Sequence, residues 1–446
     1  MINIKRYGTL CLSAILAAAF VLTPAVKIFA EEGDTAADRE TQRQTCYAEP
    51  TDSNGLTNWP QGPAVYADSA IVMDMNSGAI LYGKQIDKQH YPASITKLLT
   101  TLVALDHAKL TDKVEFSQDS ISFLQYGDAH IGMRAGEELT LEDSLYAVLL
   151  ASANEVSYAV AESVGKQMGG DYNTFIEAMN EESDALGCTG SHWTNANGLH
   201  DEQHYTTAHD MALIGAAVYQ KEAFRTIAQS LTHQIPPTNL VNEVRTVNQK
   251  HKMLWPQNAN YYEYCKGGKT GYTDQARTTL VTMADNGELQ LVAVVLYDFG
   301  SDAYTDTRAI FDYGFNNFRK VEVPGGAVTI PKDVQVSDLT TTESADGEAV
   351  RETYYFGQDY FVGTGTKTEE VAQDTEEPET LTPEVTVEPQ NDPENETDTT
   401  GSANLSQIYK IVIYILAGLI GLTVLVTIIS AVRKRHRRKR RRKGRK

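Results

Sequence analysis

The sequence predicts an α/β fold in which an antiparallel sheet is flanked by helices and carries a helical subdomain. Two strand-turn-strand patterns predict the sheet: residues 69–82, with a turn at Asn76 to Gly78, and residues 278–297, with a turn at Asp285 to Gly287. Strands at both ends of one segment indicate a single unit whose sheet is completed by distant parts of the chain. Helical patterning fills the space between them, at 141–164, 172–186 and 207–219.

Two more helices complete this main domain, which we place at residues 64–318. Residues 94–105 are apolar enough on every side to predict a buried helix. Residues 303–318 follow the second hairpin and predict a closing helix.

Both ends of the chain carry segments typical of export and membrane anchoring. Residues 1–30 combine Lys5 and Arg6 with a long apolar stretch and predict a signal peptide. Residues 411–432 form an uncharged run long enough to cross a bilayer, and 12 of the 14 residues in the tail, 433–446, are Lys or Arg. By the positive-inside rule we expect a single-pass membrane protein with an extracellular main domain and a cytoplasmic tail. A nucleic-acid-binding tail is the alternative interpretation.

Three further segments lie between these ends and the main domain. Residues 31–63 are polar without sustained periodicity and predict a flexible lead-in. Residues 319–363 hold short β-like runs separated by Gly and Pro and predict a small β-rich appendage. Residues 364–410 are dominated by Thr, Glu and Asp, which predicts an acidic, disordered stalk.

Charge and cysteine content limit the partners of the exported part. The formal net charge is −20 even though the tail is strongly basic, so the exported part is more acidic still. This balance argues against nucleic acid and anionic lipid as its partners. Three cysteines, Cys46, Cys188 and Cys265, follow the predicted signal peptide, which is too few for a disulfide framework. The sequence leaves open whether Cys188 pairs with Cys265.

Ser94 and Lys97 can supply a nucleophile and its base. They are three residues apart at the start of the predicted buried helix, which places both side chains on one face. An ammonium among apolar neighbours loses solvation, so its pKa falls and it can take a proton from a hydroxyl. The same spacing recurs at Ser163 and Lys166, so this pair alone is a weak signal.

Two further elements strengthen the prediction of a catalytic site. Ser152 and Asn154 lie in a helix-rich stretch, and a hydroxyl and an amide can relay a proton and hold a substrate amide. Lys269 and Thr270 precede Gly271 at the entry to the second hairpin, where a Lys and a Thr can hold a carboxylate. A further Ser-x-Asn within the predicted stalk is accidental.

All three elements in this order, with an apolar hairpin before the first and another after the last, resemble the penicillin-recognising serine enzymes. Within that group the chain is similar to the serine D-Ala-D-Ala carboxypeptidases, the low-molecular-weight penicillin-binding proteins, over about residues 64–318. The similar segments are Tyr91 to Lys97, Asn197 to Leu199, Asp210 to Ile214 and Lys269 to Thr273. The resemblance implies a β-lactamase/transpeptidase-like fold, and it implies neither a metal nor another cofactor.

The resemblance also implies the reaction, which is removal of the terminal D-Ala from peptidoglycan stem pentapeptides. Ser94 would be acylated by the penultimate D-Ala, or by a β-lactam antibiotic, with Lys97 as its base. Ser152 and Asn154 would line the site.

The remaining site residues follow from the same resemblance. Lys269 and Thr270, with Gly271, would bind the terminal carboxylate. The backbone N–H groups of Ser94 and Tyr272 would form the oxyanion hole. Many relatives have His where this chain has Tyr272, a change that leaves the backbone donor in place.

Other interpretations predict different chemistry. Ser94 could cap a helix, although its flanks are too apolar for an exposed face. His200 and His204 have the spacing of a metal pair, but without a third ligand motif we expect surface histidines. A β-lactamase would need a Glu-x-x-x-Asn loop, which we do not find. A D,D-endopeptidase would use the same three motifs, and a non-catalytic wall-binding scaffold would have no need of Ser94 and Lys97.

Overall fold

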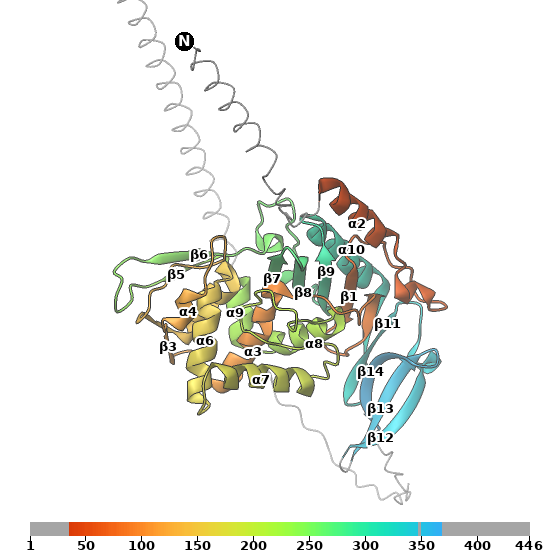
Figure 1. Cartoon of the computed structure of the whole chain (residues 1–446). Helices are drawn as coiled ribbons and strands as arrows, with labels where there is room; N and C mark the ends of the chain where they lie inside the picture. Colours follow the sequence, from red (N-terminus) through yellow and green to blue (C-terminus); the bar gives the residue numbers. More distant parts are fainter. Residues whose placement is uncertain (1–34, 347–348, 368–446) are drawn as a thin grey trace, which may run out of the picture. The chain divides into compact units, whose positions relative to one another are not determined.

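The computed structural model describes residues 35–346 and 349–367 (Figure 1). The predicted signal peptide, transmembrane segment, basic tail and nearly all of the predicted stalk lie outside the described residues. Within the described part of the chain, no helix is both long and apolar enough to cross a membrane.

The main sheet has five strands in the order β2-β1-β9-β8-β7. Both predicted hairpins are confirmed, because β1 pairs antiparallel with β2 and β8 pairs antiparallel with β9. β1 also pairs with β9, so hairpins far apart in the sequence form one sheet. The strands are β1 (Ser69–Asp74), β2 (Ile80–Lys84), β7 (Cys265–Thr273), β8 (Arg277–Asp285) and β9 (Gln290–Asp298).

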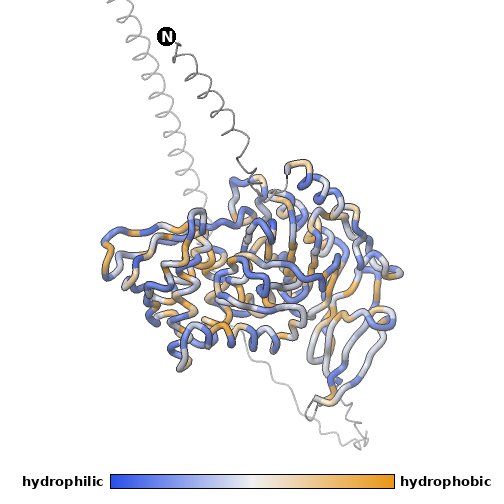
Figure 2. Tube along the Cα trace, in the orientation of Figure 1, coloured by the Kyte–Doolittle hydropathy of each residue, from blue (hydrophilic) through white to orange (hydrophobic). Residues whose placement is uncertain are grey.

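The central strands are buried on both faces. In β1, Ile71 and Met73 belong to one hydrophobic core, whereas Ala70 and Val72 belong to a second, as the two-residue period of a strand requires. α8 (Ala208–Tyr219) packs in the first core, and α10 (Asp302–Asn317) packs in the second. Hydrophobic stretches run along these inner elements in Figure 2. The predicted antiparallel sheet flanked by helices is therefore confirmed.

The helical subdomain is built around α3 (Lys97–His107), the predicted buried helix. It contacts α6 (Asn154–Gln167), α7 (Tyr172–Ala185) and α8. The smaller elements are α4 (Asp119–Ser122), α5 (Leu141–Tyr146), α9 (Glu222–Gln229), the pair β3 (Lys113–Glu115) and β4 (Glu138–Thr140), and the pair β5 (Thr232–Ile235) and β6 (Arg245–Asn248).

The predicted continuous helix over 141–164 is wrong, because the chain breaks at Ser152. α5 runs into a π-helical turn, η4 (Ala147–Ala151), and Ser152 then adopts a left-handed conformation with a φ of 62°. α6 begins only at Asn154. The apolar periodicity hides the break, since most side chains of η4 are buried. Such turns and strained residues are typical of functional sites.

Residues 35–63 are folded, so the predicted flexible lead-in is wrong for this part of the chain. α2 (Ala36–Ala48) lies beside α10, where Arg43 pairs with Asp302 (Figure 1). Its last turn is held by Lys84, a buried side chain on β2 that donates to the backbone oxygen of Cys46 at 2.6 Å. Polar contacts hold α2 in place, and Cys46 is the one buried residue of this helix. The sequence therefore shows no sustained apolar periodicity here from which a helix could be predicted.

A second five-stranded antiparallel sheet follows α10, in the order β10-β11-β14-β13-β12. It packs on the main domain through Trp59, whose ring centroid lies 5.0 Å from that of Phe356 and 4.9 Å from that of Tyr360. Its last strand continues four residues into the segment predicted as stalk. The strands are β10 (Phe318–Val323), β11 (Gly326–Pro331), β12 (Thr340–Asp346), β13 (Ala349–Phe356) and β14 (Tyr360–Lys367).

Candidate active site

Ser94 lies in a strained turn before α3. This turn, η3 (Ala93–Thr96), leads directly into the helix, and Ala93 has a φ of 51°, a left-handed conformation that is unfavourable for a residue with a side chain. Gly198 packs against the turn, and a Cβ at that position would lie 1.9 Å from the carbonyl oxygen of Ala93. Glycine is therefore required at the centre of segment 197–199, which supports the Ser94 turn.

Lys97 is fully buried and faces Ser94. Its Nζ lies 3.0 Å from Ser94 Oγ and 2.8 Å from Asn154 Oδ1, and it also donates to the backbone oxygen of Asn197. Burial, and after it the positive charge of Lys250, lowers the pKa of Lys97 to about 7. At neutral pH a substantial fraction of Lys97 is therefore an uncharged amine in contact with the Ser94 hydroxyl.

Lys269 forms a second buried lysine-serine pair across the site. Its Nζ donates to Ser152 Oγ at 2.9 Å and to the backbone oxygen of Thr270 at 2.7 Å. Burial, followed by the charges of Lys97 and Lys250, holds the pKa of Lys269 well below its usual range. The left-handed backbone of Ser152 is what turns its hydroxyl toward Lys269 rather than along a helix face.

β7 passes close to the Ser94 turn at Gly271. A Cβ at Gly271 would lie 2.9 Å from the backbone nitrogen of Ser94 and 2.3 Å from Thr279 Oγ1. Thr279 in turn donates to the backbone oxygen of Pro92 at 2.8 Å, which fixes the strand against the turn. The backbone of Ser94 and the strand that carries Tyr272 therefore meet in one place.

A cleft of about 760 Å³ opens over these residues. Six of the eight predicted site residues line it, and the other two, Lys97 and Lys269, lie behind its wall. The structure therefore brings all eight together, with two buried amines beneath two hydroxyls. The six that line the cleft are Ser94, Ser152, Asn154, Thr270, Gly271 and Tyr272.

The family model described as D-alanyl-D-alanine carboxypeptidase matches residues 57–300 of this chain. The chain belongs to this family. The predicted resemblance to serine D-Ala-D-Ala carboxypeptidases is thus confirmed, while α2 lies before the matched residues and the second sheet lies after them.

Individual members of the D-alanyl-D-alanine carboxypeptidase family align with part of the chain. The carboxypeptidase DacF of Bacillus subtilis is 29% identical over 56% of this chain and 63% of its own length. DacB2 of Mycobacterium tuberculosis is 32% identical over 57% of this chain and 84% of its own length. The chain thus spans less than two thirds of the length of DacF, and most of the length of DacB2.

Solved structures agree on the fold. The crystal structure of the Streptomyces K15 DD-transpeptidase is 23% identical and covers 58% of this chain and all of its own, with a TM-score of 0.52. A D-alanyl-D-alanine carboxypeptidase from Mycobacterium tuberculosis is 30% identical and covers 59% of this chain and 94% of its own, with a TM-score of 0.50. The main domain therefore has a transpeptidase-like fold.

Sequence reasoning missed Glu155 in this member of the family. Its fully buried carboxylate accepts the backbone N–H of Ile131 at 2.7 Å, and the backbone N–H of the neighbouring Asn154 donates to the backbone oxygen of Ala129 at 2.8 Å. These contacts fix the loop that supplies Tyr126 to Ala129 to the cleft wall. A charged residue directly after the Ser-x-Asn element, in a helix whose first half is otherwise uncharged, was the available signal.

Lys250 was also missed, although it lines the cleft. Its charge acts on both buried lysines, after the larger effect of their burial. It lies in a connecting segment after β6, where no motif marks it.

Two other expectations concern residues outside the cleft. The expectation that His204 is a surface residue is wrong: it is buried, and its ring contacts Thr96 Oγ1 at 2.8 Å and the backbone N–H of Thr194 at 3.0 Å. Its place beneath the Ser94 turn could not be read from a loop sequence. Cys188 and Cys265, whose pairing was open, are both unpaired and buried.

Proposed function

We propose that this chain is a serine D-Ala-D-Ala carboxypeptidase that removes the terminal D-Ala from peptidoglycan stem pentapeptides through an acyl-enzyme, and that penicillin acylates it at the same residue. One observation carries the proposal: the buried amine of Lys97 lies 3.0 Å from the hydroxyl of Ser94, which opens on the cleft. Membership of the family supports the same reaction.

Acylation begins when neutral Lys97 takes the hydroxyl proton of Ser94 as Oγ bonds to the carbonyl carbon of the penultimate D-Ala. Negative charge develops on the carbonyl oxygen. The backbone N–H groups of Ser94 and Tyr272 stabilise it, and the close approach of β7 at Gly271 to the Ser94 nitrogen supports this assignment.

Collapse of the tetrahedral intermediate breaks the peptide C–N bond. The departing D-Ala nitrogen needs a proton, which is the one that Lys97 took from Ser94. The Ser152 hydroxyl, which lines the cleft and contacts Lys269, relays it, and Lys97 becomes neutral again. A water molecule then gives a proton to Lys97 as its oxygen attacks the Ser94 ester; the C–Oγ bond breaks, Lys97 returns the proton to Ser94 Oγ, and the shortened peptide leaves with a new carboxyl group.

The terminal carboxylate of the substrate is assigned to the end of the cleft formed by Thr270 and Tyr272. Thr270 lines the cleft, and the buried amine of Lys269 lies directly behind it. Asn154, which also contacts Lys97, is placed to hold the substrate amide.

The test uses the full-length chain with a free stem pentapeptide, followed by mass spectrometry. We expect loss of one alanine and covalent labelling by a fluorescent penicillin. A parallel reaction with cross-linked muropeptide dimers distinguishes an endopeptidase, which would separate the dimer. A chain that neither releases D-Ala nor takes up label would be a scaffold, and the proposal would be wrong.

We also propose that the catalytic part is held outside the cell membrane by residues 411–432, with the basic tail inside and the acidic segment between as a spacer. The support is the sequence alone, namely the uncharged run followed by the cluster of Lys and Arg. Protease treatment of intact cells should remove the catalytic part and leave the tail protected; degradation of the tail alone would reverse the topology.

A further inference from the structure

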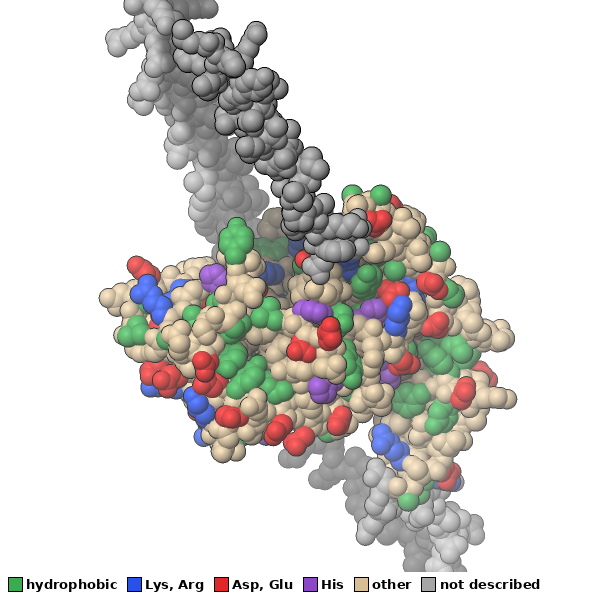
Figure 3. Space-filling view, in the orientation of Figure 1, with side chains coloured by type: hydrophobic (Ala, Val, Ile, Leu, Met, Phe, Trp, Pro, Cys, Tyr) green, Lys and Arg blue, Asp and Glu red, His purple; other side chains and the backbone are tan. Residues whose placement is uncertain are grey.

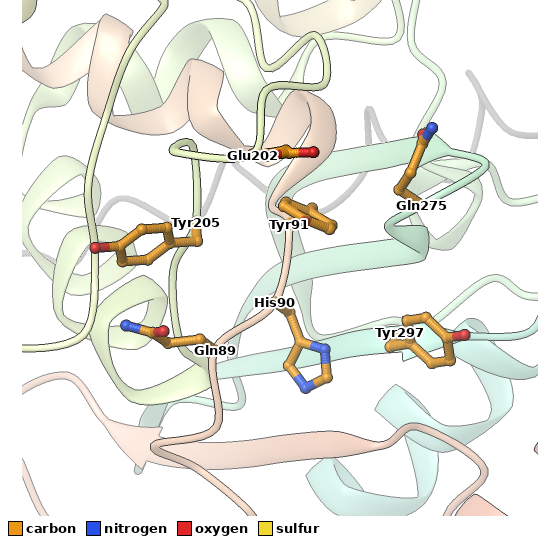
Figure 4. Close-up of a pocket in the computed structure, with 7 residues that line it drawn as sticks. All are labelled: Gln89, His90, Tyr91, Glu202, Tyr205, Gln275 and Tyr297. Carbon is orange, nitrogen blue, oxygen red and sulfur yellow. The ribbon is translucent and has the colours of Figure 1, made fainter.

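A cavity outside the cleft surrounds Tyr91, three residues before Ser94 (Figure 4). Its volume is about 320 Å³. Three half-buried tyrosines, Tyr91, Tyr205 and Tyr297, line it. In Figure 4, Tyr91 lies between Glu202 and Gln275 on one side and His90 and Tyr297 on the other.

The rim of this cavity is polar and carries no Lys or Arg among its lining residues. Gln89, Glu202 and Gln275 are exposed there. Gln89 Nε2 donates to the backbone oxygen of Gly190 at 3.2 Å, which leaves the Gln89 amide oxygen and the polar groups of Glu202 and Gln275 to meet a ligand. An aromatic lining with a few polar groups at its edge is the usual composition of a small-molecule site.

A second cavity, of about 450 Å³, shares Gln89, His90 and Tyr297 with the first. It reaches α2, which contributes Thr41, Gln42 and Thr45. We call these two neighbouring cavities together the Tyr91 groove. Because α2 lies before the residues matched by the family model, part of the groove wall is an addition to the family domain.

The Tyr91 groove lies within reach of a substrate bound at Ser94. Three residues of extended chain span at most about 11 Å, which limits the distance between the Cα atoms of Tyr91 and Ser94. Gln275 directly follows Tyr272 to Asp274, which line the cleft. Four of the five stem residues lie between the glycan and the bond that is cleaved, and they span up to about 14 Å when extended, so the attachment point of the peptide can reach the groove.

We propose that the Tyr91 groove binds the glycan strand of peptidoglycan, the uncharged chain of N-acetylated amino sugars from which the stem peptide hangs. The proposal rests on the proposed function, which supplies a substrate attached to such a chain. Tyrosine rings offer flat apolar surface to the C–H faces of sugar rings, at a low cost in side-chain entropy. The oxygens of Glu202 and the two glutamines accept from sugar hydroxyls, and the amide nitrogen of Gln275 donates to acetyl oxygens.

Charge favours a neutral polymer over an anionic one. Acidic side chains are scattered over the face shown in Figure 3, and Glu202 adds another at the rim. Lys88, which lines the second cavity, is paired with Asp68 at 2.6 Å. A phosphate-rich or carboxylate-rich polymer would meet repulsion here, whereas a glycan strand carrying amide-linked peptides would not.

The test compares the full-length chain with a double variant, Glu202→Ala with Gln275→Ala. Both side chains are exposed and lie outside the residues that line the cleft. The binding probe is an uncharged oligomer of N-acetylglucosamine, titrated calorimetrically against chains that also carry Ser94→Ala, because removing the peptides from natural glycan strands would leave a free carboxylate on every second sugar. We expect the double variant to bind at least about tenfold more weakly, since two polar partners are lost.

A kinetic arm uses the chains with Ser94 intact. The kcat/KM of the double variant should be lower than that of the parent chain on pentapeptides linked to glycan strands, and equal to it on free pentapeptide. Tyr261→Ala is the matched control, because it removes an exposed tyrosine that lines neither cavity. It should leave both glycan binding and turnover unchanged.

Each outcome has a defined meaning. The proposal is overturned if the N-acetylglucosamine oligomer fails to bind the parent chain, or if it binds the double variant equally well. A double variant with a lowered kcat/KM on free pentapeptide would also overturn the proposal, because the groove would then bind the peptide and not the glycan. Failure of the proposed function would appear separately, as absence of D-Ala release from free pentapeptide by the unaltered chain, and glycan binding could still be measured.

Discussion

The Nζ of Lys97 lies 3.0 Å from the Oγ of Ser94, and no part of the Lys97 side chain reaches solvent. The same amine is held by Asn154 and by the backbone of Asn197, on two other segments of the chain. Three contacts from different segments fix the Lys97 amine against the Ser94 hydroxyl, so the proposed base and nucleophile would need little reorganisation when a substrate reacts.

Ser94→Ala should abolish both penicillin labelling and D-Ala release, because it removes the hydroxyl that forms the acyl-enzyme. Labelling with fluorescent penicillin on a gel, together with mass spectrometry of the pentapeptide, measures both. Ser163→Ala is the control, because Ser163 and Lys166 have the same spacing as Ser94 and Lys97 but different partners. The Ser163 hydroxyl accepts the backbone N–H of Glu115 at 3.1 Å, and Lys166 forms an ion pair with Glu162 on the surface. Loss of labelling in the control would move the nucleophile away from Ser94.

The rate of penicillin acylation should rise with pH through about 7 and then level off, because burial lowers the pKa of Lys97 to about 7 and only its neutral form accepts a proton. Stopped-flow labelling across this range gives the profile. Lys97→Ala should slow acylation by roughly a hundredfold to ten-thousandfold and remove the rising limb. If the acylation rate of the Lys97→Ala variant still rises with pH through about 7, a group other than Lys97 accounts for this pH dependence.

The sequence was sufficient to predict which residues meet at the cleft, because each lies in a short local pattern. Ser94 and Lys97 share a helix turn, and Lys269 and Thr270 lie on one strand. The contacts between these patterns were not predictable, since Lys269 meets Ser152 across 117 positions of the chain. Residues that act only through such contacts, such as Glu155, carried no motif.

The two misjudged segments of the fold have physical causes. α2 shows little amphipathic signal because Lys84 and Arg43 hold it through polar contacts to other segments. The break at Ser152 is hidden because residues on both sides of it are buried, so the apolar pattern continues. Periodicity reports which side chains are buried, and it does not report backbone conformation at a single residue.

Glu155→Ala should destabilise the protein by about 1–3 kcal/mol, because the buried N–H of Ile131 loses its acceptor. The Glu155→Gln variant keeps an acceptor oxygen for this N–H, so its free energy of unfolding should fall much less. Denaturant unfolding of the three chains measures this. KM for pentapeptide should also rise in the Ala variant, since the loop that lines the cleft is no longer held.

The same residue gives a pH test with a defined sign. Burial raises the pKa of Glu155 above that of an unfolded carboxyl group, so the folded chain binds the extra proton between the two values. Its contribution to stability therefore falls as pH rises through that window. The glutamine side chain of the Glu155→Gln variant does not titrate, so the stability of this variant relative to the parent should improve with rising pH. The opposite slope would contradict the assignment.

Gly198→Ala should lower acylation by at least about a hundredfold, because the added Cβ would lie 1.9 Å from the Ala93 carbonyl oxygen and push the Ser94 turn out of place. Gly187→Ala separates this clash from backbone strain. Gly187 has a similar positive φ, 86° against 79°, but its Cβ would meet nothing within 4 Å. Equal losses in both variants would mean that conformation, and not contact with the turn, accounts for the effect.

Lys269→Ala should impair hydrolysis of peptides with a free terminal carboxylate more than that of the matched amidated peptides, because a carboxylate bound at Thr270 favours the protonated form of the Lys269 amine behind it and is attracted by it. kcat and KM for the acid and amide substrates measure the difference. Lys266→Ala is the control, because it removes a positive charge from the same strand and Lys266 does not line the cleft. This variant should hydrolyse the acid and amide substrates at the parent's kcat and KM. Because Lys269 also donates to Ser152 at 2.9 Å, equal losses on acid and amide would assign it to proton transfer through Ser152 and leave carboxylate binding to Thr270.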